Sequence, residues 1–504
     1  MIVSLIIFSN VFVGKAYCKF EIENLQNSIY LKTAQGLKLE VNPYDFLIYP
    51  NISSDKNSNS TETFDINAQI KKIGHKQVSE MFESYIQTGI IQKKVNINSS
   101  YYIIIEKSFE FLRQAIINIS EDIKNIEDFK NVNEIKLVSV ISFPDQKYGR
   151  PIIILGEFAN GFIPITVYKP RLGIQEKLLC GKDKLNKSDR SIFEIFDLPT
   201  YKIKSIEDGL NSRIYVDFIP DTTSIHRKSL GLKCKILHQL GRLLFLSPVF
   251  GIGDLHCGNL FINKEGIYLI DGEILGNCHY LNYVNEAFFD DFLDWGNFGF
   301  NKCVTKCYTT KQAIPGVNIN ISGKDKILRL VNNGNSTDEK VMKNNLSIIK
   351  KGYDFAYKKF CENFCDYNVI YELFEKISYR RFVPISSAVF LDYGWKYFND
   401  CKNKQQIGNK CVEYVEKFLF DKKYLTLLGN EWLDEKILKE EILSCLNNLT
   451  VPNFSMDINS KSTIFKINER IFAVNNDLNI TNVLNQVKNF LLNKENFKKS
   501  IINY

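Results

Sequence analysis

The sequence lacks several features that would each indicate a particular class of protein. It has no block of five or more basic residues, although 64 Lys and Arg against 57 Asp and Glu give a net charge of +7. The positive charge is therefore spread along the chain, and we expect no nucleic-acid partner. Beyond the N-terminus, no segment carries the eighteen or so consecutive apolar residues of a membrane span, so we expect none. No internal repeat is present.

Cysteine usage excludes a structural zinc site. The chain has 12 cysteines, but it contains neither a repeated CxxC nor a Cys and His spacing suitable for tetrahedral coordination. Cys278 and His279 are adjacent, which is the wrong geometry for ligands of one ion. We expect most of the cysteines to be reduced and buried.

The apolar start, residues 1–20, has two interpretations. MIVSLIIFSNVFVGKAYC resembles a secretory signal without a basic first region, and it equally fits a buried first element of the fold. A cytoplasmic location follows from the second interpretation and a secreted one from the first.

Composition and periodicity predict an ordered α+β protein. The sequence is 45% hydrophobic and 13% aromatic, which is enough for more than one core. Apolar residues recur every three or four positions between 66 and 129, as at Met81, Tyr85 and Ile90, and this indicates helices. We expect a mainly helical region at 21–134, a catalytic core at 135–300 and a helical region at 301–504.

Within the core, β-rich runs alternate with turn residues. Ile135–Ile141, Pro151–Phe158 and Phe162–Tyr168 are expected strands, and the last two form an expected hairpin. A helix is predicted from about His226 to Leu246.

The segment Gly251–Glu273 carries the residues best suited to phosphate chemistry. Asp254, His256 and Asn259 lie in a glycine-containing loop, and an apolar hairpin follows, with strands LFIN and IYLI around the turn KEG. The second strand delivers Asp271, so the hairpin should bring Asp271 close to Asn259. Amide and carboxylate oxygens suit Mg²⁺, Asp254 would orient or deprotonate a hydroxyl, and His256 could assist proton transfer.

A lysine completes this set. In ITVYKPRL, Lys169 ends a strand and Pro170 stops it. Such a lysine is often a solvated surface charge, but its place upstream of the Asp, His and Asn loop favours phosphate binding.

These residues resemble those of a known family. GIGDLHCGNLFINKEGIYLIDGE is similar to the catalytic and metal-binding loops of phosphoinositide kinases, and VYKPR is similar to a string in the dehydratase domain of class II lanthipeptide synthetases. FPDQKYGRPIIIL, RIYVDFI and LTVPNF resemble further segments of that domain, in the same order. The resemblance covers roughly residues 135–460 and implies a lipid-kinase-like, two-lobed core with additional N-terminal and C-terminal helical regions.

The resemblance implies an ATP- and Mg²⁺-dependent lanthipeptide dehydratase, which phosphorylates Ser or Thr of a peptide or protein substrate and then eliminates phosphate. Lys169 and Arg171 would bind the cofactor. Asp254 and His256 would be catalytic. Asn259 and Asp271 would hold the metal. In that family elimination uses an arginine and a threonine six residues apart on a later helical segment, and the candidates here are Arg380 with Ser386, and Arg381 with Ser387.

Several departures weaken the elimination step. The histidine usual near Asp145 is absent, serine replaces threonine, proline or isoleucine stands where a second arginine is common, and the metal strand ends in DGE where the family has DLE. Residues 300–504 also lack the zinc ligands of a cyclase domain. A protein or lipid kinase without elimination, and a nucleotide-binding pseudoenzyme, remain alternatives. The sequence does not indicate the oligomeric state.

Overall fold

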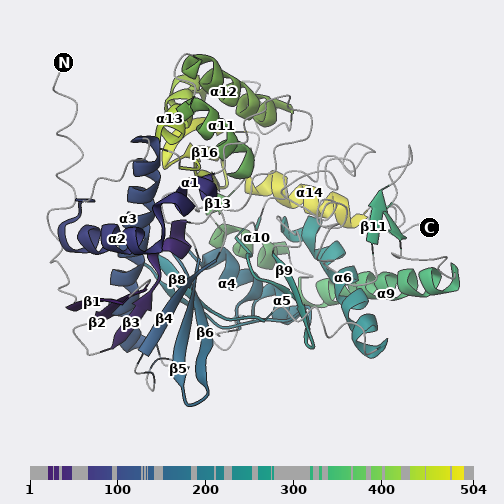
Figure 1. The fold of residues 1–504 in the computed structure, drawn as a ribbon. Helices are drawn as coiled ribbons and strands as arrows, with labels where there is room; N and C mark the ends of the chain where they lie inside the picture. Colours follow the sequence, from purple (N-terminus) through teal and green to yellow (C-terminus); the bar gives the residue numbers. More distant parts are fainter. Residues whose placement is uncertain are drawn as a thin grey trace. The chain divides into compact units, whose positions relative to one another are not determined.

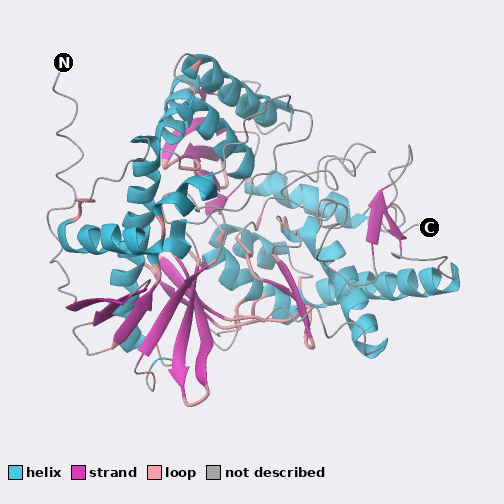
Figure 2. Ribbon diagram, viewed as in Figure 1, coloured by secondary structure: helices cyan, strands magenta, loops and turns pink. Residues whose placement is uncertain are grey.

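The computed structural model describes a mixed α+β chain (Figure 1, Figure 2). The described residues are 21–25, 28–32, 37–47, 66–92, 99–126, 129, 132, 134–140, 151–182, 190–208, 212–220, 230–252, 259–273, 275–276, 318–321, 328–331, 339–364, 367–377, 379–381, 387–399, 403–421, 432–448, 450–476 and 479–492. The chain divides into two compact units, 1–144 with 148–170, and 145–147 with 171–504. None of the described helices is both long and apolar enough to cross a bilayer.

In the part of the first unit that the structure describes, six strands follow the sequence order across one sheet. Neighbouring strands are antiparallel except β3 and β4, which are parallel. The strands are β1 (Glu21–Leu25), β2 (Ser28–Lys32), β3 (Lys38–Val41), β4 (Glu134–Ser139), β5 (Ile152–Phe158) and β6 (Gly161–Lys169). The expected hairpin of β5 and β6 is confirmed. Because β3 pairs with β4, the first unit extends beyond residue 134, where a domain boundary was expected.

Among the described residues, three helices and two short 3-10 turns also belong to the first unit. They are η1 (Pro43–Leu47), α1 (Ile66–Ile73), α2 (His75–Thr88), α3 (Ser99–Asp122) and η2 (Ile123–Asn125). The apolar residues that predicted these helices are buried, and the rings of Phe82 and Phe109 lie 4.9 Å apart. Ile90 is the exception. It follows Gly89, which ends α2 with a φ of 73°, and it is 65% exposed.

One polar contact joins α3 to the strand that ends in VYK. The side-chain amide of Asn118 donates to the hydroxyl of Tyr168 over 2.9 Å, and both residues are buried. A buried hydroxyl with a partner avoids the cost of desolvation without a hydrogen bond. The contact therefore fixes the end of β6, where Lys169 lies.

The second unit contains the remaining elements. They are α4 (Ile174–Cys180), α5 (Ile192–Ile195), β7 (Ile203–Ile206), β8 (Arg213–Asp217), α6 (Leu230–Phe250), β9 (Leu260–Asn263), β10 (Gly266–Leu269), β11 (Asn318–Ile321), β12 (Leu328–Val331), α9 (Glu339–Asn363), α10 (Tyr367–Lys376), β13 (Tyr379–Arg381), α11 (Ser387–Asn399), α12 (Lys404–Asp421), β14 (Trp432–Leu433), α13 (Glu435–Asn448), β15 (Phe454–Ile458), β16 (Thr463–Ile467), β17 (Arg470–Asn475) and α14 (Ile480–Leu492).

Helices α6 and α9 pack together through two glycines. A Cβ added at Gly241 would lie closer than 3.0 Å to the carbonyl oxygen of Ile349, and one at Gly352 would lie as close to that of His238. Only glycine permits such an approach of two backbones. Beside this crossing, Phe245 makes an edge-to-face contact with Tyr353, with ring centroids 5.3 Å apart.

The C-terminal part of the second unit holds a sheet that the sequence analysis missed. Five strands lie in the order β13-β15-β16-β17-β14, all antiparallel. The expectation of a mostly helical region at 301–504 did not include these strands. FSMDI and TIFKI show the alternation of a half-buried strand, with Phe454, Met456, Phe465 and Ile467 buried. That alternation was the available signal.

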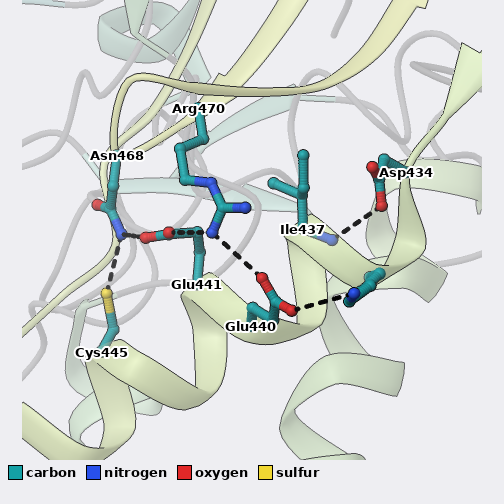
Figure 3. Close-up of polar contacts among 8 residues, drawn as sticks. Asp434, Ile437, Glu440, Glu441, Cys445, Asn468 and Arg470 are labelled. Carbon is teal, nitrogen blue, oxygen red and sulfur yellow. Dashed lines mark hydrogen bonds and ion pairs between the residues drawn. The ribbon is translucent and has the colours of Figure 1, made fainter. Parts of the chain in front are cut away.

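A polar cluster joins α13 to the hairpin of β16 and β17 (Figure 3). The side-chain amide of Asn468 donates to Glu441 over 2.9 Å and lies 3.2 Å from the sulfur of Cys445, and its oxygen accepts from the backbone of Asn453. Arg470 makes ion pairs with Glu440 and Glu441, at 3.3 and 2.9 Å. Asn468 therefore ties the hairpin turn both to α13 and to the segment LTVPNF.

Two substitutions at this turn should differ in their effect on the free energy of unfolding. Asn468 and Glu469 both have positive φ, at 48° and 70°. Asn468→Ala removes the polar contacts and should lower the free energy of unfolding by about 1–3 kcal/mol. Glu469→Gly relieves a backbone strain of about 1–2 kcal/mol at the cost of a more flexible unfolded chain, so it should be neutral or stabilise by up to about 1 kcal/mol. Urea unfolding measures both, and equal losses would contradict this account of the turn.

Candidate functional site

The hairpin of β9 and β10 forms as the sequence predicts. Asn263 pairs with Gly266 around a two-residue turn, and Leu260 pairs with Leu269. The pairing continues past the strands, because the amide of Ile270 donates to the carbonyl oxygen of Asn259 over 2.9 Å. Asp271 is the next residue. The backbone thus places the two predicted metal ligands at adjacent positions at one end of the hairpin.

Helix α6 holds the other end of this hairpin through Gln239, which the sequence analysis did not single out. The side chain of Gln239 is buried. Its oxygen accepts from the amide of Ile267 over 2.9 Å, and its amide donates to the carbonyl oxygen of Glu265 over 3.5 Å. Gly266 has a φ of 126°, and a Cβ there would collide with the Gln239 amide. The glycine of the KEG turn is therefore required both by its own backbone and by Gln239.

Replacing Gln239 with leucine should loosen the hairpin without removing the side-chain volume. The buried amide of Ile267 would lose its acceptor, so we expect the free energy of unfolding to fall by about 1–3 kcal/mol. Hydrogen exchange at Ile267 should accelerate more than exchange within α3. Lys264→Ala, at an exposed position of the same turn, is the control and should leave both measurements near wild type.

An arginine from VYKPR binds the carboxylates that follow the hairpin. The guanidinium of Arg171 lies 2.5 Å from Glu176 and 2.5 Å from Glu273, and it also makes an ion pair with Asp271. Arg171 and Glu273 are 102 positions apart in the sequence. Two motif segments that the sequence analysis treated separately therefore meet at one guanidinium. We call these four residues the Arg171 cluster.

The inner part of the Arg171 cluster is anchored by Tyr201. Its hydroxyl lies 2.7 Å from Glu176 and 2.8 Å from the carbonyl oxygen of Leu269. Burial, reinforced by the negative charge of Glu176, raises the pKa of Tyr201 well above its ordinary value. The hydroxyl therefore keeps its proton at neutral pH and acts as a donor. Neither Glu176 nor Tyr201 was predicted. Glu176 follows Arg171 by only five positions, but Tyr201 meets Glu176 across 25 positions and only through the fold.

The departure from DLE to DGE at the end of the metal strand has a structural reason. A Cβ at Gly272 would lie 3.2 Å from Leu179 and 3.4 Å from the sulfur of Cys180, both on α4. A larger side chain at this position would therefore fit only if the Leu179 side chain moved. The glycine thus lets Asp271 and Glu273 approach the helix that carries Glu176.

The other predicted site residues have different locations. Lys169 is a buried residue at the end of β6 in the first unit, whereas the Arg171 cluster belongs to the second. Asp254 and His256 lie outside the described residues. Asn259 is buried at the start of the hairpin.

The predicted elimination residues do not lie on one helix. Arg380 and Arg381 belong to β13, where they pair with Met456 and Ser455 of β15. The expectation of a helical arginine segment, catalytic or merely on a helix surface, is therefore wrong for the arginines. Ser387 begins α11, and Ser386 lies outside the described residues. The arginines instead share a sheet with the segment that follows LTVPN.

The predicted oxygen ligands would suit a magnesium ion that keeps part of its hydration shell. Among the described residues, no three His, Cys, Asp or Glu side chains are grouped as a metal cage. Mg²⁺ commonly uses only one or two carboxylates and completes its octahedron with water and phosphate oxygens. Asn259 and Asp271 would supply two hard oxygen donors. The formal charge of the Arg171 cluster is −2, from three carboxylates and one guanidinium, so a divalent cation would neutralise it.

No family model and no curated protein matches this sequence. The functional argument therefore depends on the motif resemblance and on the geometry of the hairpin and the Arg171 cluster.

Proposed function

We propose that the chain is an ATP- and Mg²⁺-dependent kinase-like enzyme that phosphorylates Ser or Thr of a peptide or protein, in the manner of a lanthipeptide dehydratase. The ion pair between Arg171 and Asp271 is the observation that carries the proposal. It joins the VYKPR motif to Asp271, which follows β10, and both segments are parts of the resemblance. Lys169 precedes Arg171 by two residues in the chain.

Each of these residues would have a separate role in phosphoryl transfer. Mg²⁺, when bound, would neutralise charge on the transferring phosphate. Asn259 and Asp271 would hold the ion, and Lys169 would bind phosphate oxygens. Asp254 would accept the proton of the attacking hydroxyl. The new bond joins the substrate oxygen to the terminal phosphorus of ATP, the bond from that phosphorus to ADP breaks, and ADP leaves.

A kinase without elimination is the second candidate. The position of Arg380 and Arg381 on a strand favours it, because the resemblance placed the elimination arginine on a helical segment. Elimination would require removal of the proton α to the phosphorylated residue's carbonyl, with departure of phosphate. Phosphoryl transfer needs none of these later residues.

Mass spectrometry of a candidate peptide after incubation with ATP and Mg²⁺ tests the proposal. A gain of one phosphate identifies the kinase, and a net loss of one water identifies the dehydratase. Intact-mass analysis of small peptides encoded beside this protein and co-expressed with it reports substrate and reaction together. An unchanged mass for every peptide, with no ATP consumed, would contradict both candidates.

A further inference from the structure

The carboxylates of the Arg171 cluster differ in exposure in a consistent order. The side chain of Glu176 is 1% exposed, that of Glu273 is 13% exposed and that of Asp271 is 33% exposed. All three contact the same guanidinium, which is itself 11% exposed. The cluster thus has a buried end at Glu176 and an accessible end at Asp271.

The buried end is fixed by more than one bond. The backbone of Tyr201 accepts from the amide of Lys182 over 2.8 Å and donates to the carbonyl oxygen of Cys180 over 3.2 Å, so it is tied to the end of α4. Its hydroxyl reaches back to Glu176 in the first turn of the same helix. Because Tyr201 is held through both its backbone and its hydroxyl, it offers a rigid support for Glu176.

We propose that Tyr201 and Glu176 are positioning residues, which act through Arg171 to fix Asp271 in the orientation that the proposed metal site needs. The proposal rests on the proposed function, because Asp271 is the metal ligand there. Partners that orient a metal ligand commonly change metal affinity by 10- to 100-fold when they are removed. Tyr201 and Glu176 touch neither the ion nor the substrate in this arrangement.

A double-mutant cycle tests the connection without any ligand. Tyr201→Phe removes only the hydroxyl, and Asp271→Asn removes the charge at the accessible end. If Tyr201, Glu176, Arg171 and Asp271 act as one unit, the loss of stability in the double variant should differ from the sum of the two single losses. Additive losses would overturn the proposal. If Tyr201→Phe does not fold, Glu176→Gln replaces it in the same cycle.

The hairpin provides a matched control. Tyr268 is also buried, and its hydroxyl also contacts a glutamate, but that partner is Glu265 at the turn and not a member of the Arg171 cluster. Tyr268→Phe should therefore be additive with Asp271→Asn. Equal coupling for Tyr268→Phe and Tyr201→Phe would show a general effect of tyrosine removal and would also overturn the proposal.

Manganese binding separates this proposal from the proposed function. We expect the wild-type protein to bind Mn²⁺, measured by electron paramagnetic resonance, and Tyr201→Phe to weaken that binding about tenfold or more. An unchanged affinity in Tyr201→Phe would overturn the positioning role. If the wild type binds no Mn²⁺, with or without ATP, the metal site of the proposed function fails, while the cycle still decides whether Tyr201 fixes Asp271.

Discussion

Gly241→Ala is expected to lower the free energy of unfolding by about 3 kcal/mol or more, or to prevent folding. The added methyl would collide with the carbonyl oxygen of Ile349, which is backbone and cannot move away by a rotamer change. Overpacking of this kind costs about 1–3 kcal/mol and occasionally more. Alanine gains at most about 1 kcal/mol of helix propensity over glycine, so the collision outweighs the gain. Urea unfolding followed by circular dichroism measures the loss.

Two further variants show whether the helix crossing is the cause. Gly352→Ala should be as damaging, because its methyl would meet the carbonyl oxygen of His238 from the opposite helix. Lys358→Ala is on the same helix as Gly352, its side chain is 80% exposed, and it should unfold like the wild type. A wild-type midpoint for Gly241→Ala would show that α6 and α9 are not held at this distance in solution.

Asp271→Asn is expected to reduce phosphoryl transfer about a hundredfold or more while the chain stays folded. The change removes one negative charge from the proposed metal site, and loss of a transition-state charge contact commonly costs that much. The effect on stability should be small, because Asp271 is a third exposed and Glu176 and Glu273 keep Arg171 paired. The rate is measured as ATP consumption in the presence of a peptide that the wild type modifies. Thermal unfolding measures stability.

Binding measurements distinguish the metal role of Asp271 from other reasons for lost activity. The thermal midpoint of the wild type should rise with ATP and Mg²⁺ together, and this rise should be much smaller for Asp271→Asn. Lys264→Ala, at the turn of the same hairpin, should behave as the wild type in both assays. An equal rise for wild type and Asp271→Asn would remove the metal assignment, though not nucleotide binding.

Local pattern was sufficient to predict the two hairpins. The strands of β5 with β6, and of β9 with β10, combine apolar residues with turn signals a few residues apart, so pairing and turn are set by neighbours in the sequence. The pairing of Asn259 with Ile270 follows from that register. The helices between 66 and 129 were predicted on similar grounds, except that Gly89 ends α2 before Ile90.

Contacts between distant segments could not be predicted from pattern. Arg171 meets Glu273 across 102 positions, and Tyr201 meets Glu176 only because the backbone after α5 returns to the end of α4. Gln239 is one of several polar residues in the α6 sequence, and nothing in the sequence distinguishes it from the others. Its role depends on the hairpin that packs beside it. The apolar pattern of α6 gives no information about that neighbour.

The pairing of β13 with β15 sets where the chain can be shortened. A truncation after Asp421 would keep Arg380 and Arg381 but delete Ser455 and Met456, their backbone partners. It would also remove β14, β16 and β17, so the rest of the five-stranded sheet would be lost together. A shortened protein that lost activity would therefore not reveal a function of the deleted segment, because the arginine strand would have lost its hydrogen-bonded neighbour as well.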